Sequence, residues 1–313
     1  MTTVPIVFAF DNNLAMPAAV CIYSLLVNAK PSTAYDIYIL HRKNQPLDLS
    51  KVERVMEHFP QSTLTLREVG DVFDSSFEIR GITTPAYYRL LIPDLIPEHD
   101  RVIYSDVDVI FRQDLSEVYT SPLGDNILAG VNNLAHVDAD LKAHYEGALG
   151  LNPHNIICSG FLVMDCAAMR RENLKNRFLE LAKNRYKFQD QDVLNITCAG
   201  RIKMLAPKYS LLTYISYYSI TNGKDSLETL WTAAEVDEAL REGNVHYNGN
   251  KPWKNWCVNF DIWWEYYRKS PIFDQKYYFD FYYSRLNELD QLPLLKRIKI
   301  LVRYFVYGRR NNP

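Results

Sequence analysis

The sequence has 313 residues, of which 48% are hydrophobic and 23% charged, and its formal net charge is −2. This is the composition of a soluble globular chain, long enough for one large α/β domain or two smaller ones, and the near-neutral charge argues against a general nucleic-acid binder. The five cysteines are scattered and form no C-x-x-C pair, which argues against a zinc ribbon or a disulfide scaffold. We identify no signal peptide and no apolar run that could span a membrane, and we predict a cytoplasmic protein.

Strand-like and helix-like segments alternate along most of the chain. Short runs of β-branched and aromatic residues predict strands, and apolar residues at helical spacing predict helices. The predicted strands are residues 6–10, 35–40, 64–68, 102–104, 127–131 and 157–164. The predicted helices are residues 14–28, 47–59, 85–92, 166–186 and 191–199. The third of these helices is expected to end before Pro93. The alternation predicts an α/β fold with a mostly parallel central sheet and helices on both faces.

From about residue 259 the chain is rich in aromatic and basic residues. Its last segment has apolar residues at helical spacing, and Lys296, Arg297, Lys299 and Arg303 occupy much of the remaining surface. Such a basic amphipathic helix is typical of a segment that binds an anionic membrane. The alternative is a terminal helix that packs on its own domain. We therefore predict a main domain, residues 1–258, and a helical extension, residues 259–313, that is a candidate for membrane attachment.

Two aspartates, Asp106 and Asp108, directly follow the strand predicted at residues 102–104. The carboxyl ends of strands are where ligands bind in open α/β sheets, and residues i and i+2 of an extended segment point the same way. Two carboxylates aimed at one point repel each other unless a proton or cation lies between them, and their hard oxygen atoms suit Mg²⁺ or Mn²⁺. A solvated turn is the alternative, but the apolar runs on both sides favour a cation site.

Two further polar segments lie where ligands are expected. Asp11 and Asn13 follow the first strand and suit hydrogen bonds to a nucleotide, although an Asx turn would explain them equally. Asp190 and Gln191 open a predicted helix, where N-capping and the helix dipole would account for one of the carboxylates but not for Gln189 and Gln191.

A third segment, residues 246–253, combines several groups that suit a phosphate and metal site. His246 is a candidate metal ligand, Gly249 permits close approach of the backbone to a ligand, and Lys251 offers a point charge for a phosphate. A lone histidine is more often structural, but the segment as a whole is more specific than the histidine.

Together these segments resemble glycosyltransferase family 8, the retaining sugar-nucleotide transferases that include bacterial lipooligosaccharide galactosyl- and glucosyltransferases and glycogenin. The resemblance covers roughly residues 4–256 and rests on the motifs above with two more, residues 87–93 and 159–165, in the family's order. It implies a GT-A nucleotide-diphospho-sugar transferase fold over residues 1–258. It also implies a UDP-sugar donor and a bound Mn²⁺, with Mg²⁺ as the second choice.

The resemblance also implies roles for individual residues. Asp106, Asp108 and His246 would hold the metal. Asp190 would bind sugar hydroxyls, and Gln191 would face the reacting side of the anomeric carbon. The donor would contact the following residues: Asp11, Asn13, Arg89, Asp106, Val107, Gly249 and Lys251.

The implied function is transfer of a hexose, glucose or galactose, from a UDP-sugar to a saccharide or glycolipid acceptor of the cell surface, such as lipopolysaccharide. The protein would act at the inner face of the membrane as a peripheral protein, with no nucleic-acid partner. An amide is a poor nucleophile, so Gln191 favours attack by the acceptor on the same face over a stable glycosyl-enzyme. The acceptor would be bound by residues 132–155 and 209–232.

Three other functions share some of these sequence features. A haloacid-dehalogenase-type phosphatase also has Asp-x-Asp after a strand, but Val109 and its apolar neighbours do not fit that motif. A glycogenin-like self-glycosylating enzyme and a non-catalytic sugar- or lipid-binding relative remain as alternatives. The sequence departs from the family's usual pattern at Cys158, at Asn132 or Asn133, and at Leu14, which weakens any prediction of sugar specificity.

Overall fold

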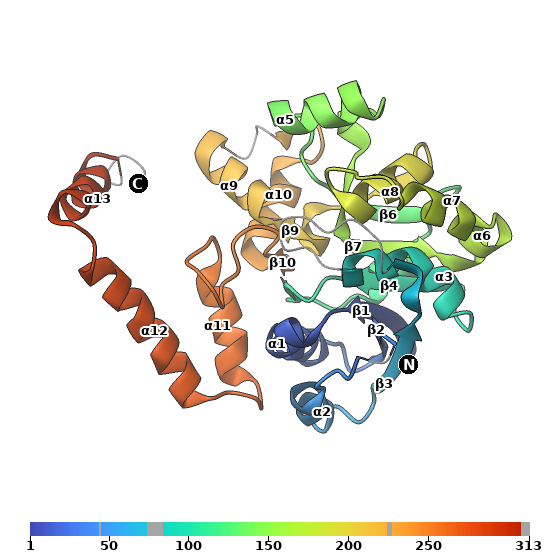
Figure 1. Ribbon diagram of the computed structural model, residues 1–313, viewed down its shortest axis with the longest axis horizontal. Coiled ribbons are helices and arrows are strands. Elements are labelled where there is room, and N and C mark those ends of the chain that lie inside the picture. Colours follow the sequence, from blue (N-terminus) through green and yellow to red (C-terminus); the bar gives the residue numbers. More distant parts are fainter. Residues whose placement is uncertain (44, 74–83, 224–226, 308–313) are drawn as a thin grey trace.

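The computed structural model describes residues 1–43, 45–73, 84–223 and 227–307 and is built around a seven-stranded sheet (Figure 1). The strand order in this sheet is β3-β2-β1-β4-β7-β6-β8, and a second, three-stranded sheet has the order β5-β10-β9. The strands are β1 (Thr2–Ala9), β2 (Thr33–Arg42), β3 (Thr63–Val69), β4 (Arg101–Ser105), β5 (Val109–Ile110), β6 (Leu128–Asn132), β7 (Ile157–Asp165), β8 (Ile202–Met204), β9 (Leu211–Leu212) and β10 (Val245–His246).

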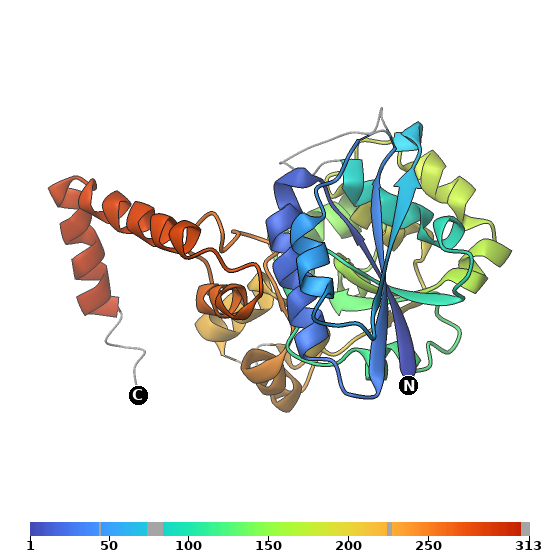
Figure 2. The same ribbon diagram turned by 90° about the horizontal axis from the view of Figure 1, so that it is seen from below.

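The predicted mostly parallel sheet is confirmed. Strands β3, β2, β1 and β4 run parallel to one another, as do β6 and β8, and only β7 runs antiparallel to its neighbours β4 and β6. Figure 2 shows this sheet edge-on with helices on both of its faces. The parallel strands therefore end at one edge, where polar residues after different strands meet.

The helices follow in chain order. The α-helices are α1 (Ala15–Val27), α2 (Ser50–Met56), α3 (Ile92–Leu95), α4 (Ser116–Thr120), α5 (Ala139–Lys142), α6 (Cys166–Arg171), α7 (Leu174–Leu181), α8 (Gln189–Thr197), α9 (Thr213–Asn222), α10 (Ala233–Glu242), α11 (Phe260–Lys269), α12 (Gln275–Asp290) and α13 (Leu294–Tyr307). The tighter or wider helical segments are η1 (Asn12–Leu14), η2 (Asp71–Phe73), η3 (Thr84–Leu91), the π-helix η4 (Ala143–Ala148), η5 (Pro153–Asn155) and η6 (Pro207–Tyr209).

Two apolar cores lie on the two faces of the sheet. On β1, Ile6 and Phe8 face a core shared with α1 and α2, whereas Val7 faces a core shared with η3 and α6–α8. Alternation along the strand thus divides its apolar residues between the two faces, as expected for a strand that is buried on both sides.

Two predicted helices differ from the structure. The single helix expected at residues 166–186 is two helices, α6 and α7, because Asn173 adopts the left-handed conformation with φ 53° between them. Asparagine is one of the few residues that tolerate this conformation. Residues 84–91 form a 3₁₀-helix, and the chain continues through Pro93 into α3, where proline is tolerated because it lies in the first turn.

The C-terminal segment is helical, as predicted, and its helices α11, α12 and α13 differ in how they pack on the rest of the chain. Helix α11 packs into the main core through Trp263, Trp264 and Tyr267. Helix α12 packs on α11 through Phe281 and Tyr282, and α13 follows at the far end of α12 (Figure 1). The described apolar side chains of α13 are 46–82% exposed: Leu294, Leu295, Ile298, Leu301 and Val302. The alternative prediction, a last helix packed on its own domain, does not hold for these side chains. No described helix is long and apolar enough to cross a membrane.

Candidate active site

One cleft of about 650 Å³ runs along the carboxyl ends of the parallel strands and brings together the polar segments singled out in the sequence. Most of the predicted site residues line it: Asp11, Arg89, Asp106, Val107, Asp108, Asp190, Gln191, His246, Gly249 and Lys251. A volume of this size is in the range of sites for small molecules and cofactors. Asn13 is exposed and is not among the lining residues.

The candidate cation ligands, Asp106, Asp108 and His246, lie where the large sheet meets the small one. Asp106 follows β4 of the large sheet, and Asp108 precedes β5 of the small one. In the antiparallel β5–β10 pair, His246 lies opposite Val109, and the Tyr247 backbone N–H donates to the Asp108 carbonyl at 2.9 Å. On the other side, the Asp106 N–H donates to the Gly160 carbonyl of β7 at 2.9 Å. Backbone pairing thus positions all three side chains.

The three ligand atoms of Asp106, Asp108 and His246 lie within 4.8 Å of one another. His246 Nε2 is 3.3 Å from Asp108 Oδ1 and 4.0 Å from Asp106 Oδ2. Burial alone would lower the pKa of His246, but the Asp108 carboxylate raises it to about 10. Burial alone would raise the pKa of Asp108, but Lys251 and His246 together hold it well below its usual range. The Asp108 carboxylate therefore stays ionised between two basic side chains, His246 and Lys251.

These residues fit a divalent cation. Asp108 Oδ1 is buried and has no hydrogen bond of good geometry, although His246 lies nearby. Two carboxylates and one imidazole form a ligand set that suits Mn²⁺. Mg²⁺ would also bind the carboxylate oxygen atoms of this set. Ser210 Oγ lies 3.1 Å from His246 Nδ1, so a second residue orients the ring and leaves Nε2 facing the carboxylates.

Two neighbours of this cluster were missed in the sequence. Ser210 precedes β9, and Tyr104 donates its hydroxyl to Asp106 Oδ1 at 2.7 Å. Nothing in the local sequence around Ser210 marks it, because β9 reaches His246 only through its pairing with β10. Tyr104 belongs to the apolar run of β4, and nothing in that run indicates that its hydroxyl group reaches Asp106.

Arg89 is buried and contacts several polar groups at once. Its guanidinium donates to Asp106 Oδ1 at 2.8 Å and to the Ser159 carbonyl at 2.5 Å, and it lies 3.2 Å from Asp190 Oδ2. Burial raises the pKa of Asp190 to about 6 even though Arg89 opposes that shift. Arg89 therefore ties the metal candidates to the start of α8.

Gln191 lines the cleft from the first turn of α8. The first residue of this helix, Gln189, has a left-handed backbone conformation with φ 49°. Asn195 then fixes the helix to β7 through two hydrogen bonds of 3.0 Å with the backbone of Ile157. The Gln191 amide itself accepts from the Ser159 N–H at 3.2 Å.

The phosphate candidates lie beside the cation cluster. Lys251 Nζ contacts Asp108 Oδ2 and donates to the Tyr247 carbonyl at 2.5 Å, so the ammonium points into the cleft next to the carboxylates. A Cβ on Gly249 would meet only the Thr213 side chain, at 3.8 Å, which leaves the backbone there open to a ligand.

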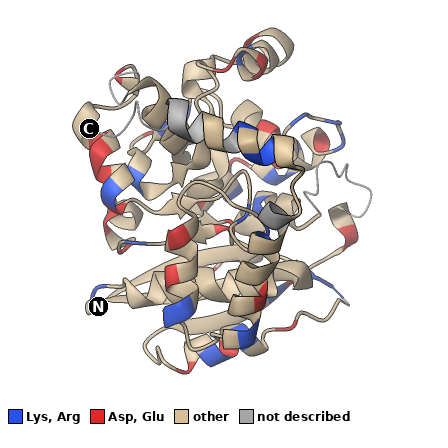
Figure 3. Cartoon of the chain, turned by 90° about the vertical axis from the view of Figure 1, so that its left-hand side faces the viewer, with Lys and Arg blue, Asp and Glu red and all other residues tan. Residues whose placement is uncertain are grey.

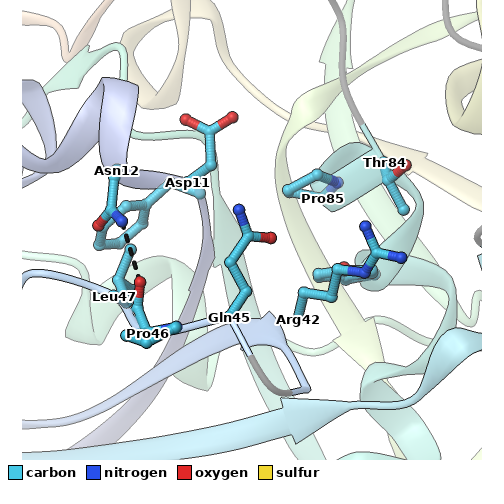
Figure 4. A pocket seen from close by; sticks show the side chains of 10 residues that line it. Asp11, Asn12, Arg42, Gln45, Pro46, Leu47, Thr84 and Pro85 are labelled. Atoms are coloured by element: carbon cyan, nitrogen blue, oxygen red, sulfur yellow. Dashed lines mark hydrogen bonds between the residues drawn. The ribbon is translucent and has the colours of Figure 1, made fainter.

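A smaller hollow of about 190 Å³ adjoins the cleft at the ends of β1 and β2 and shares Asp11 with it (Figure 4). Asp11 accepts from the Asn13 N–H at 2.9 Å, so the Asx turn considered above is present. Asn12 Nδ2 donates to the Pro46 carbonyl at 2.9 Å and fixes the loop after β2. Asp11 nevertheless remains on the cleft wall.

The family model for glycosyl transferase family 8 matches residues 5–257. The chain belongs to this family. It is therefore a glycosyltransferase, which acts on a sugar donor and a saccharide acceptor. The resemblance seen in the sequence is confirmed, including its extent along the chain.

Among curated family 8 relatives, general stress protein A of Bacillus subtilis is 25% identical over 80% of this chain and 87% of its own length. Glycosyltransferase GlyF of Streptococcus pneumoniae is 25% identical over 83% of this chain, which spans 60% of GlyF. The lipopolysaccharide 1,2-glucosyltransferase of Escherichia coli K12 is 24% identical over 55% of this chain and 50% of its own length.

Two solved glycosyltransferase structures share the fold. Galactosyltransferase LgtC, in complex with donor and acceptor sugar analogues, superposes with a TM-score of 0.73 at 22% identity and covers 88% of this chain and 99% of LgtC. The bifunctional glycosyltransferase WbbM gives a TM-score of 0.71 at 24% identity over 88% of this chain and 51% of WbbM. The predicted GT-A fold is thus confirmed.

Proposed function

We propose that this family 8 enzyme transfers a hexose, glucose or galactose, from a UDP-sugar to a saccharide or glycolipid acceptor such as lipopolysaccharide, with retention of configuration. The observation that carries the proposal is the single cleft that contains the Asp106–Asp108–His246 cluster, Lys251 and Gln191. The names of LgtC and of the Escherichia coli relative support a hexose donor and a cell-surface acceptor.

Each part of the cleft would contribute differently. Asp106, Asp108 and His246 would hold Mn²⁺, which when bound supplies positive charge for a departing diphosphate. Lys251, beside Asp108, would add a second positive charge for the same phosphates. Asp11 would contact the nucleoside, as would the backbone at Val107, and Gly249 would allow close approach of the phosphates.

At the sugar end, neither candidate nucleophile is suited to forming a covalent intermediate. Asp190 is buried beside Arg89, and Gln191 is an amide held by Ser159. Attack by the acceptor hydroxyl on the same face, with positive charge on the sugar ring, fits these two side chains better than a glycosyl-enzyme does.

Incubation of the protein with a UDP-sugar and Mn²⁺ is expected to release UDP without any increase in the intact mass of the protein, because neither Asp190 nor Gln191 is suited to accept the sugar covalently. Mass spectrometry of the whole chain checks this result. A gain of one hexosyl unit would indicate a covalent intermediate, and a ladder of units would indicate self-glycosylation. Absence of UDP release from every donor would favour a non-catalytic binding protein.

The cleft is also lined by Tyr214 of α9 and by Asp138 and Asp140 around α5, none of which is assigned to the donor. An aromatic ring packs on the apolar face of a sugar, and carboxylates accept hydrogen bonds from hydroxyl groups. We therefore propose that the acceptor saccharide lies between α5 and α9.

Tyr214→Ala is expected to raise the acceptor KM roughly 30-fold, equivalent to about 2 kcal/mol for a buried aromatic contact, while hydrolysis of the donor by water is unchanged. Parallel assays of transfer and hydrolysis check this separation. Tyr217→Ala on the same helix is the matched control, because Tyr217 is equally exposed but does not line the cleft. An equal loss in both variants would argue against an acceptor role for Tyr214.

We further propose that α13 attaches the enzyme to an anionic membrane. Its exposed apolar side chains share one face, and Lys296, Arg297 and Lys299 lie around it, with no acidic residue between residues 293 and 302. Figure 3, seen from the side of this helix, shows basic residues along its described part. The peripheral membrane location predicted above rests on this proposal.

Removal of residues 293–313 is expected to weaken binding to phosphatidylserine vesicles by at least about 100-fold, since each basic residue near such a surface contributes about 1 kcal/mol and the apolar face adds more. Donor hydrolysis should be unaffected. Vesicle co-sedimentation measures membrane binding, and UDP release measures donor hydrolysis. The double variant Lys51→Glu and Lys183→Glu, at exposed sites elsewhere, is the control. Unchanged vesicle binding by the truncated chain would contradict the proposal.

A further inference from the structure

A buried hydrogen-bonded layer lies behind Gln191, on the side away from the cleft. Tyr145, in the π-helix η4, is fully buried, and its hydroxyl lies 2.7 Å from Gln191 Nε2. On its other side, the Gln191 amide accepts through Oε1 from the Ser159 N–H of β7, at 3.2 Å. The amide is therefore held between two elements that are distant from α8 in the sequence.

These two contacts determine which way the amide faces. A backbone N–H can only donate, so the atom beside Ser159 must be the oxygen Oε1, and the atom beside Tyr145 must then be Nε2. The Tyr145 hydroxyl accepts from that nitrogen. Without the hydroxyl, the Ser159 contact alone would hold the amide, and this contact is the longer of the two.

Tyr145 is itself held rigidly. Its ring stacks on Phe188, with centroids 6.0 Å apart and planes 13° from parallel, and His144 packs against it edge-on. The His144 Nε2 atom lies 2.8 Å from Asp192 Oδ2, which also accepts from the Phe188 N–H at 3.0 Å. Burial, and then the Asp192 charge, raise the pKa of Tyr145, so that its hydroxyl stays neutral.

The helical segment that carries Tyr145 also reaches the part of the cleft proposed for the acceptor. Helix α5 continues directly into η4, and Asp138, Asp140 and Leu141 at its start line the cleft. One continuous piece of chain thus lines the cleft where we place the acceptor and carries the hydroxyl that contacts Gln191.

We propose that Tyr145 is a positioning residue that fixes the amide of Gln191 at the sugar end of the cleft and so maintains the rate of glycosyl transfer. This inference rests on the proposed function, in which Gln191 lies at the reacting face. Tyr145 itself does not line the cleft.

The Tyr145→Phe variant keeps the stacked ring and removes only the hydroxyl. It is expected to lower kcat about 10-fold, the loss of one buried hydrogen bond, for both transfer and donor hydrolysis, with the donor KM unchanged. In a Gln191→Ala background the same substitution should have no further effect, because Tyr145 acts through that amide. Tyr35→Phe is the control, since it removes another buried hydroxyl, which accepts from the Leu115 N–H at 2.9 Å outside the cleft.

Three results would overturn the inference: an unchanged kcat in Tyr145→Phe, a tenfold loss that persists in the Gln191→Ala background, or an equal loss in Tyr35→Phe. A second measurement is independent of turnover. The side-chain ¹⁵N–¹H₂ signals of Gln191, assigned by their loss in Gln191→Ala, should shift in Tyr145→Phe and not in Tyr35→Phe. If the wild-type protein turned over no donor, the proposed function would fail, and these signals alone would decide the placement of the amide.

Discussion

Asp108→Asn is expected to lower Mn²⁺-dependent donor turnover by at least about 1000-fold while the protein remains folded. The substitution conserves volume but removes the negative charge that lies beside both His246 and Lys251. Metal-assisted stabilisation of a leaving group contributes several kcal/mol, and each 1.36 kcal/mol is about a factor of ten in rate. UDP release over a range of Mn²⁺ concentrations, with isothermal calorimetry of Mn²⁺ binding, measures the effect.

Asp114→Asn is the matched control for this variant. Asp114 is a buried aspartate that accepts from the Ser116 and Lys30 N–H groups, both at 2.9 Å, near the start of α4 and outside the cleft. It should retain full turnover. Wild-type Mn²⁺ dependence in Asp108→Asn would contradict the metal assignment, and an equal loss in Asp114→Asn would show that the effect is not specific to the site.

Gly160→Ala is expected to weaken Mn²⁺ binding roughly 100-fold, and turnover with it, although Gly160 is not itself a ligand. A Cβ at this position would lie 2.7 Å from Asp106 Oδ2 and 2.8 Å from His246 Nε2, and closer still to His246 Cε1. Neither side chain can move away easily, because His246 is buried and Asp106 is held by Arg89 and Tyr104. Calorimetric titration with Mn²⁺ measures the loss.

Gly70→Ala is the control for this second variant, since a Cβ there would meet no atom within 4 Å. It should bind Mn²⁺ as the wild type does. If Gly160→Ala kept the wild-type affinity, the cation would not lie between Asp106 and His246 as we propose.

The parts of the fold that the sequence predicted best depend on local pattern. The apolar runs of β1, β2 and β4 are buried strands, and the aspartates after β4 lie at the ligand-binding edge of the sheet because the strand before them is parallel to β1. Asp106, Asp108 and His246 were each identified from residue type and context, and the structure brings them together.

The parts that were missed depend on contacts between distant segments. The two-residue strands β5, β9 and β10 have no periodicity to detect, yet their pairing places His246 beside Asp108 and Ser210 behind the ring. Tyr145 lies 46 residues from Gln191, in a π-helix that no local pattern indicates.

The break at Asn173 was also missed, because only its left-handed backbone separates α6 from α7.

The most direct test of the proposed activity is release of UDP from UDP-glucose, UDP-galactose and the two N-acetyl analogues by metal-stripped wild-type protein, with and without added Mn²⁺ or Mg²⁺. We expect slow hydrolysis of UDP-glucose or UDP-galactose that requires the metal, is highest with Mn²⁺ and stops when EDTA is added. Turnover that is unaffected by EDTA, or no UDP release from any of the four donors with Mn²⁺ present, would contradict the proposal.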